Sequence, residues 1–459
     1  MTHVHLIGIG GTGLSAIAWV LVEKGYTVSG SDRTLSPLAR NLQSAGVEVS
    51  LGHKAENILG ADIVLRSSAI PDNNPEVLAA RQAGIPVYKR ADFLGQLMAD
   101  HLGIAVAGTH GKTTTTAMIA WMLTAIGQDP TYVVGSVLQN LGANAHAGQG
   151  PAFVIEADEY DYMFLGLNPQ VSVVTSVEHD HPDLFPTGRK YRQAFLDFVK
   201  RLPAKGILLA CSDDPGAAEI LSKSLSLGIH GLSYGTGAHA DYQARSLQAN
   251  ALGGYTFTAA VSAQPMAQIQ MQIPGEHNVR NALAAFAVAE VLGLPLEESA
   301  QALSAFRGTS RRFEIRGIAQ GITVIDDYAH HPTEIRATLT AARSRFPGQR
   351  IWAVWQPHTY SRTRALFDEF AASFKDADHV IVSEVYAARE PAQPFSAAQV
   401  VKEMDHPGAR FVAGLSEIAG ALVKELRAGD VLIVLSAGDA DQVSTQVLAA
   451  IRERMGQNA

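Results

Sequence analysis

The chain has 459 residues, enough for about three domains of ordinary size. Apolar residues make up 47% and charged residues 17% of the chain, which excludes a disordered or collagen-like protein, and the net charge of −8 excludes a uniformly basic surface for nucleic acid or anionic membrane. The lone Cys211 excludes an internal disulfide, and neither a signal peptide nor a membrane-length apolar run is visible, so we expect a cytoplasmic protein without nucleic-acid or membrane partners.

Short apolar runs alternate with stretches of helical period along most of the chain, which predicts βαβ units, mostly parallel sheets and an α/β fold. Changes in this pattern predict domains at 1–100, 101–310 and 311–459. In the first domain we expect a helix at 13–24 and strands at 3–9, 26–30, 62–66 and 85–88.

A glycine-rich loop lies between the first predicted strand and the first predicted helix. Gly8, Gly10 and Gly13 match the pattern G-x-G-x-x-G, and Asp32 lies at the end of the next strand. Such glycines let the backbone approach a pyrophosphate at the helix N-terminus, and the acid can bind a ribose hydroxyl. The loop therefore predicts a site for a dinucleotide or another nucleotide diphosphate, the alternative being glycines that only allow tight packing of strand and helix.

A second loop, GTHGKT, starts at Gly108 between a predicted strand at 103–107 and a predicted helix at 112–126. Successive backbone N–H groups and the helix dipole would form a nest for phosphates at this junction. Lys112 would reach the β and γ phosphates, and the Thr113 hydroxyl would bind Mg²⁺. Val106 stands where the leading glycine of the usual P-loop pattern belongs, so the loop is a shortened variant.

Two later strands of the central domain end in segments rich in carboxylates and histidine, EADEYD and EHDHPD. Because ligands bind at the carboxyl ends of strands in open α/β sheets, both segments should face the phosphate loop. Carboxylate oxygens suit Mg²⁺, and an imidazole can join a second divalent ion, so we select Glu156 and His181 as metal ligands. The other residues are interpreted as helix caps and loop residues. The remaining elements expected in this domain are strands at 152–155, 171–175 and 206–210, antiparallel hairpins within 242–274, and a helix at 278–292.

The third domain carries two clusters of Asp, His and Arg at predicted strand ends, DDYAHHPTE from Asp326 and QPHTYSRTR from Gln356. Together they predict a second wall of the site, although each alone would fit a helix N-cap with solvated charges. Gly275 to Asn281 and Arg311-Arg312 mark junctions of the kind where interdomain sites form. The strands expected here lie at 322–326, 350–355, 379–383 and 430–435.

The segments GTHGKTTT, EADEYD, GEHNVRNALAA, RRFE and DDYAHHPTE, in this order, resemble the signatures of the Mur ligase family, and the resemblance covers the whole chain. It implies an N-terminal Rossmann-like domain that holds a UDP substrate and a central P-loop ATPase domain of α/β fold with an antiparallel β subregion. It also implies a C-terminal Rossmann-like domain that closes over both. The loop from Gly8 to Gly13 would then bind the pyrophosphate of UDP rather than NAD.

The resemblance implies an ATP-dependent amide ligase of peptidoglycan biosynthesis that uses ATP and Mg²⁺, or Mn²⁺, and works as a monomer or weak homodimer. GIGGTG together with QPHTYSRTR implies that L-alanine is joined to the lactyl carboxylate of UDP-N-acetylmuramate through an acyl phosphate. A ligase that adds a tripeptide to the same acceptor is the close alternative, because it shares EADEYD. An NAD-dependent oxidoreductase is a more remote alternative that leaves the phosphate loop without a role.

The resemblance also implies roles for individual residues. The catalytic residues would be Lys112, His358 and Arg362. ATP would be bound by Gly108, Thr109, His110, Gly111, Lys112, Thr113, Thr114, His277, Asn278, Asn281, Arg312 and Asp327. The UDP substrate would be bound by Gly10, Gly11, Thr12, Gly13, Asp32, Ser68, His331, Arg362 and Arg364. The metal ligands would be Thr113, Glu156 and His181.

Overall fold

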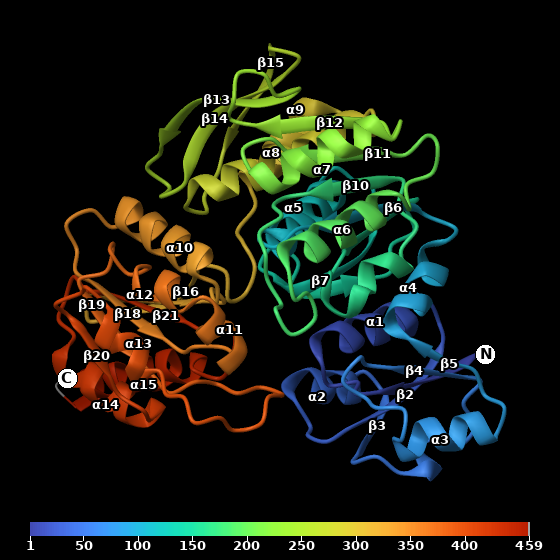
Figure 1. The fold of residues 1–459 in the computed structure, drawn as a ribbon, viewed down its shortest axis with the longest axis horizontal. Helices are drawn as coiled ribbons and strands as arrows, with labels where there is room; N and C mark the ends of the chain where they lie inside the picture. The colour runs from blue at the N-terminus through green and yellow to red at the C-terminus, as the bar shows by residue number, and fades with distance from the viewer. Residues whose placement is uncertain (458–459) are drawn as a thin grey trace.

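A computed structural model describes residues 1–457, which form three consecutive α/β domains, each built around its own sheet (Figure 1). The N-terminal domain is blue in Figure 1, the central domain runs from teal to yellow, and the C-terminal domain is orange to red. The C-terminal domain lies beside the central domain, and the cavity described below opens between the two. The predicted α/β fold with parallel sheets and an antiparallel subregion is confirmed.

The N-terminal sheet is parallel and has the strand order β3-β2-β1-β4-β5. Because β1 leads directly into the glycine loop and then α1, this loop lies at the carboxyl edge of the sheet. The strands are β1 (His3–Ile7), β2 (Thr27–Asp32), β3 (Glu48–Leu51), β4 (Ile63–Arg66) and β5 (Val87–Lys89). The helices are α1 (Thr12–Glu23), α2 (Pro37–Ser44), η1 (Ala55–Ile58), α3 (Pro75–Gln82) and α4 (Arg90–Met98).

The central sheet has the order β15-β14-β13-β12-β11-β10-β6-β9-β7-β8. Its middle is parallel, whereas β8 and the β13–β15 region at its two ends pair antiparallel. The strands are β6 (Leu102–Ala107), β7 (Thr131–Leu138), β8 (Ala143–His146), β9 (Ala152–Glu156), β10 (Val171–Val174), β11 (Ile207–Cys211), β12 (Gly231–Gly235), β13 (Tyr242–Ala249), β14 (Tyr255–Val261) and β15 (Gln264–Gln270). The helices are α5 (Lys112–Ala125), η2 (Tyr160–Gly166), α6 (Gly188–Val199), α7 (Pro215–Ser226), α8 (Glu276–Val291) and α9 (Leu296–Ser304).

The C-terminal sheet has the order β16-β17-β21-β18-β19-β20, parallel except for the antiparallel edge strand β16. The sequence pattern did not predict β16, whose run EIRGIA lacks clear alternation, nor the β7–β8 pair. The strands are β16 (Glu314–Ala319), β17 (Ile322–Asp327), β18 (Ile351–Trp355), β19 (His379–Val382), β20 (Ala409–Phe411) and β21 (Val431–Leu435). The helices are α10 (Pro332–Arg345), α11 (Tyr360–Ala365), α12 (Phe367–Ala371), α13 (Ala398–Glu403), α14 (Leu415–Glu425) and α15 (Asp441–Gln457).

One continuous apolar core joins the N-terminal and central domains. It includes Val20 of α1 and Val134 of β7, and α1 packs against β7 and β8. The C-terminal domain has separate cores on the two faces of its sheet, with Trp355 in one and Trp352 in the other. Within residues 1–457, no helix is both long and apolar enough to cross a membrane.

Candidate active site

A cavity of about 270 Å³ lies between the phosphate loop, helix α8 and the C-terminal domain. Of the residues predicted to bind ATP, it is lined by His110, Gly111, Thr113, Thr114, His277, Asn278, Asn281, Arg312 and Asp327. Residues from two domains therefore meet at one site, as the strand-end argument predicts.

The phosphate loop joins β6 to α5. Gly111 has a φ of +82°, a left-handed conformation that residues with a side chain rarely adopt, and it ends the loop directly before the helix. Lys112 folds back over the loop, where its Nζ donates to the Thr109 carbonyl at 3.3 Å and to the Gly108 carbonyl. The Thr109 hydroxyl donates to the Glu178 carbonyl at 2.8 Å, which ties the loop to the segment after β10.

A buried carboxylate that was not predicted from the sequence pairs with the loop lysine. Glu159 accepts from Lys112 Nζ at 2.9 Å and from the Tyr191 hydroxyl at 3.0 Å. Although burial opposes ionisation, Lys112 and His181 lower the pKa of Glu159 to about 2. Burial likewise opposes charging of the lysine, but Glu159 raises the pKa of Lys112 above its usual value. Both groups are therefore charged at neutral pH.

The predicted metal ligands lie at the same edge of the sheet. Thr113 Oγ1 is 3.3 Å from Glu156 Oε2, and Glu156 also accepts from the Gly135 amide. Burial raises the pKa of Glu156 above its usual value, although the Gly135 amide and Lys112 oppose the shift. A hydroxyl and a carboxylate beside a phosphate nest are hard oxygen donors, so these residues fit Mg²⁺. The third predicted metal ligand, His181, lies beside Glu159, with its Nε2 at 3.6 Å from Glu159 Oε1.

At the α8 end of the cavity, a neutral histidine and two amides lie beside Arg280. Burial and the nearby Arg280 lower the pKa of His277 to about 4, so its imidazole carries no charge at neutral pH. Asn281 donates to Asn278 Oδ1 at 3.0 Å, and Asn278 donates to the Pro274 carbonyl at 2.7 Å, which fixes both amides. Oriented amides beside an uncharged imidazole have the chemistry to hold a flat base.

Arg312 and Asp327 close the cavity from the C-terminal side. The Arg312 guanidinium lies 5.1 Å from the centre of the Tyr328 ring. Asp327 accepts from the amides of Phe313 and Ala329, both at 2.7 Å. Burial raises the pKa of Asp327 despite the nearby Arg312.

Arg362 connects the C-terminal domain to the segment after β10. Its Nε and Nη2 donate to the two carboxylate oxygens of Asp180 at 2.9 and 3.2 Å, and both side chains are buried. Nη1 donates to the His358 carbonyl at 2.9 Å. Arg364, predicted beside Arg362, is exposed instead and does not join this cluster.

His358 lies against the same arginine, and its ring stacks on Tyr386 with centroids 5.7 Å apart. Burial and Arg362 lower the pKa of His358 to about 4. The imidazole is therefore neutral at pH 7, but it is a weak base.

The residues predicted for the UDP substrate divide between two places. Gly10 donates its amide to Asp32 Oδ2 at 2.9 Å, so Asp32 shapes the glycine loop that also contains Gly11, Thr12 and Gly13. A Cβ at Gly13 would collide with the Arg90 guanidinium, which lies over the loop. Ser68 is exposed, and its neighbour Ser67 lies closer to Gly8.

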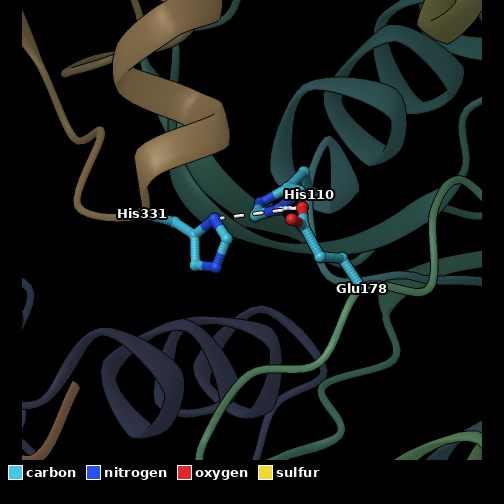
Figure 2. A group of neighbouring side chains, drawn as sticks. All are labelled: His110, Glu178 and His331. Atoms are coloured by element: carbon cyan, nitrogen blue, oxygen red, sulfur yellow. Dashed lines mark hydrogen bonds and ion pairs between the residues drawn. The ribbon is translucent and has the colours of Figure 1, made fainter. Parts of the chain in front are cut away.

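His331 lies elsewhere, at the boundary of the central and C-terminal domains (Figure 2). It is the N-cap of α10 and accepts from the Thr333 amide at 3.3 Å. Its Nε2 is buried and has no hydrogen-bond partner among the described residues.

Five residues of the site were not predicted from the sequence: Arg90, Glu159, Glu178, Asp180 and Glu334. Each of them had a signal in the sequence. Arg90 directly follows β5. The segments EADEYD and EHDHPD contain Glu159, Glu178 and Asp180, and DDYAHHPTE contains Glu334. What the sequence could not provide is the partner of each residue.

Comparison with known proteins agrees with this architecture. Family models match residues 3–102 (Mur ligase family, catalytic domain), 106–289 (Mur ligase middle domain) and 311–438 (Mur ligase, glutamate ligase domain). UDP-N-acetylmuramate–L-alanine ligase of Sorangium cellulosum is 44% identical over 95% of this chain and 94% of its own length. The ligase of the same name from Geobacter sp. is 42% identical over 98% of both chains.

Solved structures give the same result. UDP-N-acetylmuramate-alanine ligase of Thermotoga maritima superposes with a TM-score of 0.84 at 28% identity, covering 99% of this chain and 100% of its own. A murein peptide ligase of Psychrobacter arcticus reaches 0.73 at 27% identity, covering 98% and 99%. Family models match all three domains, and a relative is 44% identical over 95% of the chain. The chain therefore belongs to the Mur ligase family.

Proposed function

We propose that this chain joins L-alanine to the lactyl carboxylate of UDP-N-acetylmuramate in an ATP-dependent reaction of peptidoglycan synthesis. The observation that carries the proposal is that the phosphate loop, helix α8 and the C-terminal residues Arg312, Asp327 and Glu334 line one cavity. Full-length relatives of up to 44% identity bear the name of this ligase, which supports the same reaction.

The geometry supports a division of labour among the domains. The glycine loop of the N-terminal domain offers backbone amides at a helix N-terminus, and Arg90 adds a cation, as a UDP pyrophosphate requires. Arg90 also pairs with Asp158 of the central domain at 3.1 Å, so this loop connects to the segment after β9.

A carboxylate is a poor electrophile toward amines, so one of its oxygens must first become a leaving group. The lactyl carboxylate would attack the γ-phosphorus of ATP and release ADP. The alanine amine would then attack the acyl carbon and release inorganic phosphate. The chain's contribution to both steps is positioning and charge neutralisation, as in other phosphoryl transfers.

Lys112 and the loop amides would neutralise charge on the transferred phosphate. When nucleotide arrives, Lys112 would exchange its bond to Glu159 for bonds to phosphate oxygens. Thr113 and Glu156 would hold Mg²⁺, which when bound neutralises charge on the phosphates.

We assign His358 a role in positioning Arg362 rather than the role of general base. An α-amino group titrates near pH 8, about four units above the pKa of about 4 that burial gives this imidazole. A base that weak does not remove the proton efficiently. Arg362 would hold a carboxylate of the substrates.

The tripeptide-adding ligase remains the second candidate, because a murein peptide ligase is similar over nearly the whole chain. The higher TM-score of the alanine ligase, 0.84 against 0.73, favours alanine.

Phosphate release measured with ATP, Mg²⁺ and UDP-N-acetylmuramate, against a panel of amino acids and the tripeptide, tests the proposal. We expect release with L-alanine, one phosphate per amide formed, and little release with the tripeptide. Equal release without any UDP-sugar acid would disprove a ligase. Release with the tripeptide alone would select the second candidate.

A further inference from the structure

The side chain of His110 in the phosphate loop lies between carboxylates from two domains. Its Nε2 is 2.9 Å from Glu178 Oε2, which follows β10, and its Nδ1 is 3.0 Å from Glu334 Oε1 in the first turn of α10 (Figure 2 shows the first pair). A neutral imidazole has a proton on only one nitrogen, and ionised carboxylates can only accept. The geometry therefore requires the imidazolium form.

We propose that Glu334 is a positioning residue of the ligase reaction, which holds the C-terminal domain closed over the phosphate loop through the imidazolium of His110. The inference rests on the proposed function, because closure matters only if both domains serve one reaction. The His110 ring belongs to the loop itself. Its bond to Glu334 therefore fixes the loop relative to Arg312 and Asp327 across the cavity.

The local structure of α10 aims Glu334 at the loop. Glu334 occupies the third helical position, and its second oxygen accepts from the His330 amide at 3.0 Å, a contact similar to a capping box. The adjacent Thr333 hydroxyl donates to Glu178 Oε1 at 3.0 Å. Both carboxylates around His110 are thus fixed by further bonds, and one of these again crosses the domain boundary.

The charges around the ring favour its protonated form. The titratable or charged groups that face this cluster are Glu178, Glu334, Asp180, His331, His330, His277, Arg312 and Arg362. Burial opposes the charge, but the two glutamates raise the pKa of His110 to about 9. Burial lowers the pKa of His331, His330 and His277, so these three rings are neutral at pH 7.

The pH dependence has a definite sign. Because the pKa of His110 is raised from 6.5 to about 9, the link is complete below pH 6.5 and is lost as the pH rises through about 9. Above that pH, Glu178 and Glu334 would face each other without a cation between them, and this link between the domains would be lost.

A metal ion is the alternative occupant of this cluster, since ligand atoms of His110, Glu178 and His331 lie within 4.8 Å of one another. The hydrogen bonds favour a protonated His110 over a bound metal ion. Both nitrogens of His110 face carboxylates, and Nδ1 of His331 accepts from a backbone amide. One equivalent of a transition metal in the purified protein, lost in His110→Gln, would overturn the proposal.

The test measures the pKa of His110 by NMR in protein with isotope-labelled histidine rings. The resonance that is missing from His110→Gln is assigned to His110. In Glu334→Gln we expect the pKa of His110 to fall by about one to two units, because a charge-assisted bond is lost. The alkaline limb of kcat/KM for phosphate release should move down by the same amount. Glu334→Asp keeps the charge on a shorter side chain and should give intermediate values.

Glu417→Gln is the matched control, because Glu417 is an exposed acid in the first turn of α14 in the same domain. It should change neither the titration nor the pH profile. The proposal fails if His110 titrates near 6.5 in the wild-type chain, or if Glu334→Gln shifts the titration without shifting the alkaline limb. The titration needs no substrate, so its outcome is independent of whether the chain ligates alanine.

Discussion

Arg362 and Asp180 show how much one buried ion pair contributes to the contact between two domains. Both side chains are buried, and the two hydrogen bonds are 2.9 and 3.2 Å long. Asp180→Asn would leave a buried guanidinium without a counter-charge, which costs about 3–5 kcal/mol in comparable sites. We expect a large loss of kcat/KM in the phosphate-release assay, because the unpaired arginine would favour separation of the domains.

The matched control for this prediction is Glu425→Gln, which breaks the half-exposed pair of Glu425 with Arg410 in the C-terminal domain. Exposed pairs contribute about 0–1 kcal/mol, so this variant should retain its activity and its resistance to urea. Equal effects of the two substitutions would contradict a special role for the buried pair.

For single residues, the sequence predicts which side chains lie near the site better than it predicts which residues they contact. Lys112, Thr113 and Glu156 were predicted from the local motif and the strand end, and the structure places all three beside the phosphate loop. Asp180 was set aside as a cap or loop residue, because nothing near it in the chain indicates its partner. Its bond to Arg362 spans 182 residues, and such pairs are decided by how the domains pack.

At the scale of single elements, two helix glycines illustrate how packing decides the effect of the same change. Gly95 lies inside α4, and a Cβ there would collide with the Gly166 carbonyl of η2 in the central domain. Gly420 lies inside α14, is exposed, and has open space around its Cα.

Gly95→Ala should destabilise the protein by about 1–3 kcal/mol, because overpacking outweighs the gain in helix propensity. Gly420→Ala should stabilise it by up to about 1 kcal/mol, since alanine loses less backbone entropy than glycine in a helix. Urea unfolding of the two variants beside the wild-type chain measures both effects. A stabilising Gly95→Ala would show that α4 and η2 are not in close contact.

The sequence predicted most of the strands and helices that surround the cavity, because long apolar runs and glycine loops are local signals. It did not predict β3, β12, β16 or β20, nor the pairing of β7 with β8. In β16 the outward Ile315 and Ile318 are exposed and Gly317 interrupts the pattern, so the strand depends on its pairing with β17. Edge strands of this kind are specified by their neighbours more than by their own residues.

At the scale of the whole molecule, the three domains are not equally independent. The apolar core that contains Val20 and Val134 runs without a break from the N-terminal to the central domain. The buried apolar residues of the C-terminal domain form separate clusters, and polar pairs such as Arg362–Asp180 connect this domain to the rest. The first two domains should therefore unfold as one unit and the third as another.

Native-state hydrogen exchange at increasing denaturant can resolve these units. We expect amides of α1 and β7 to share one free energy of opening, because separating them exposes a common core, and amides of β18 and β21 to share a different one. Asp180→Asn should change the protection of amides at the domain boundary near Arg362 while leaving the joint opening of α1 and β7 unchanged. If amides of α1 exchange through an opening in which amides of β7 stay protected, the two domains do not unfold as one unit.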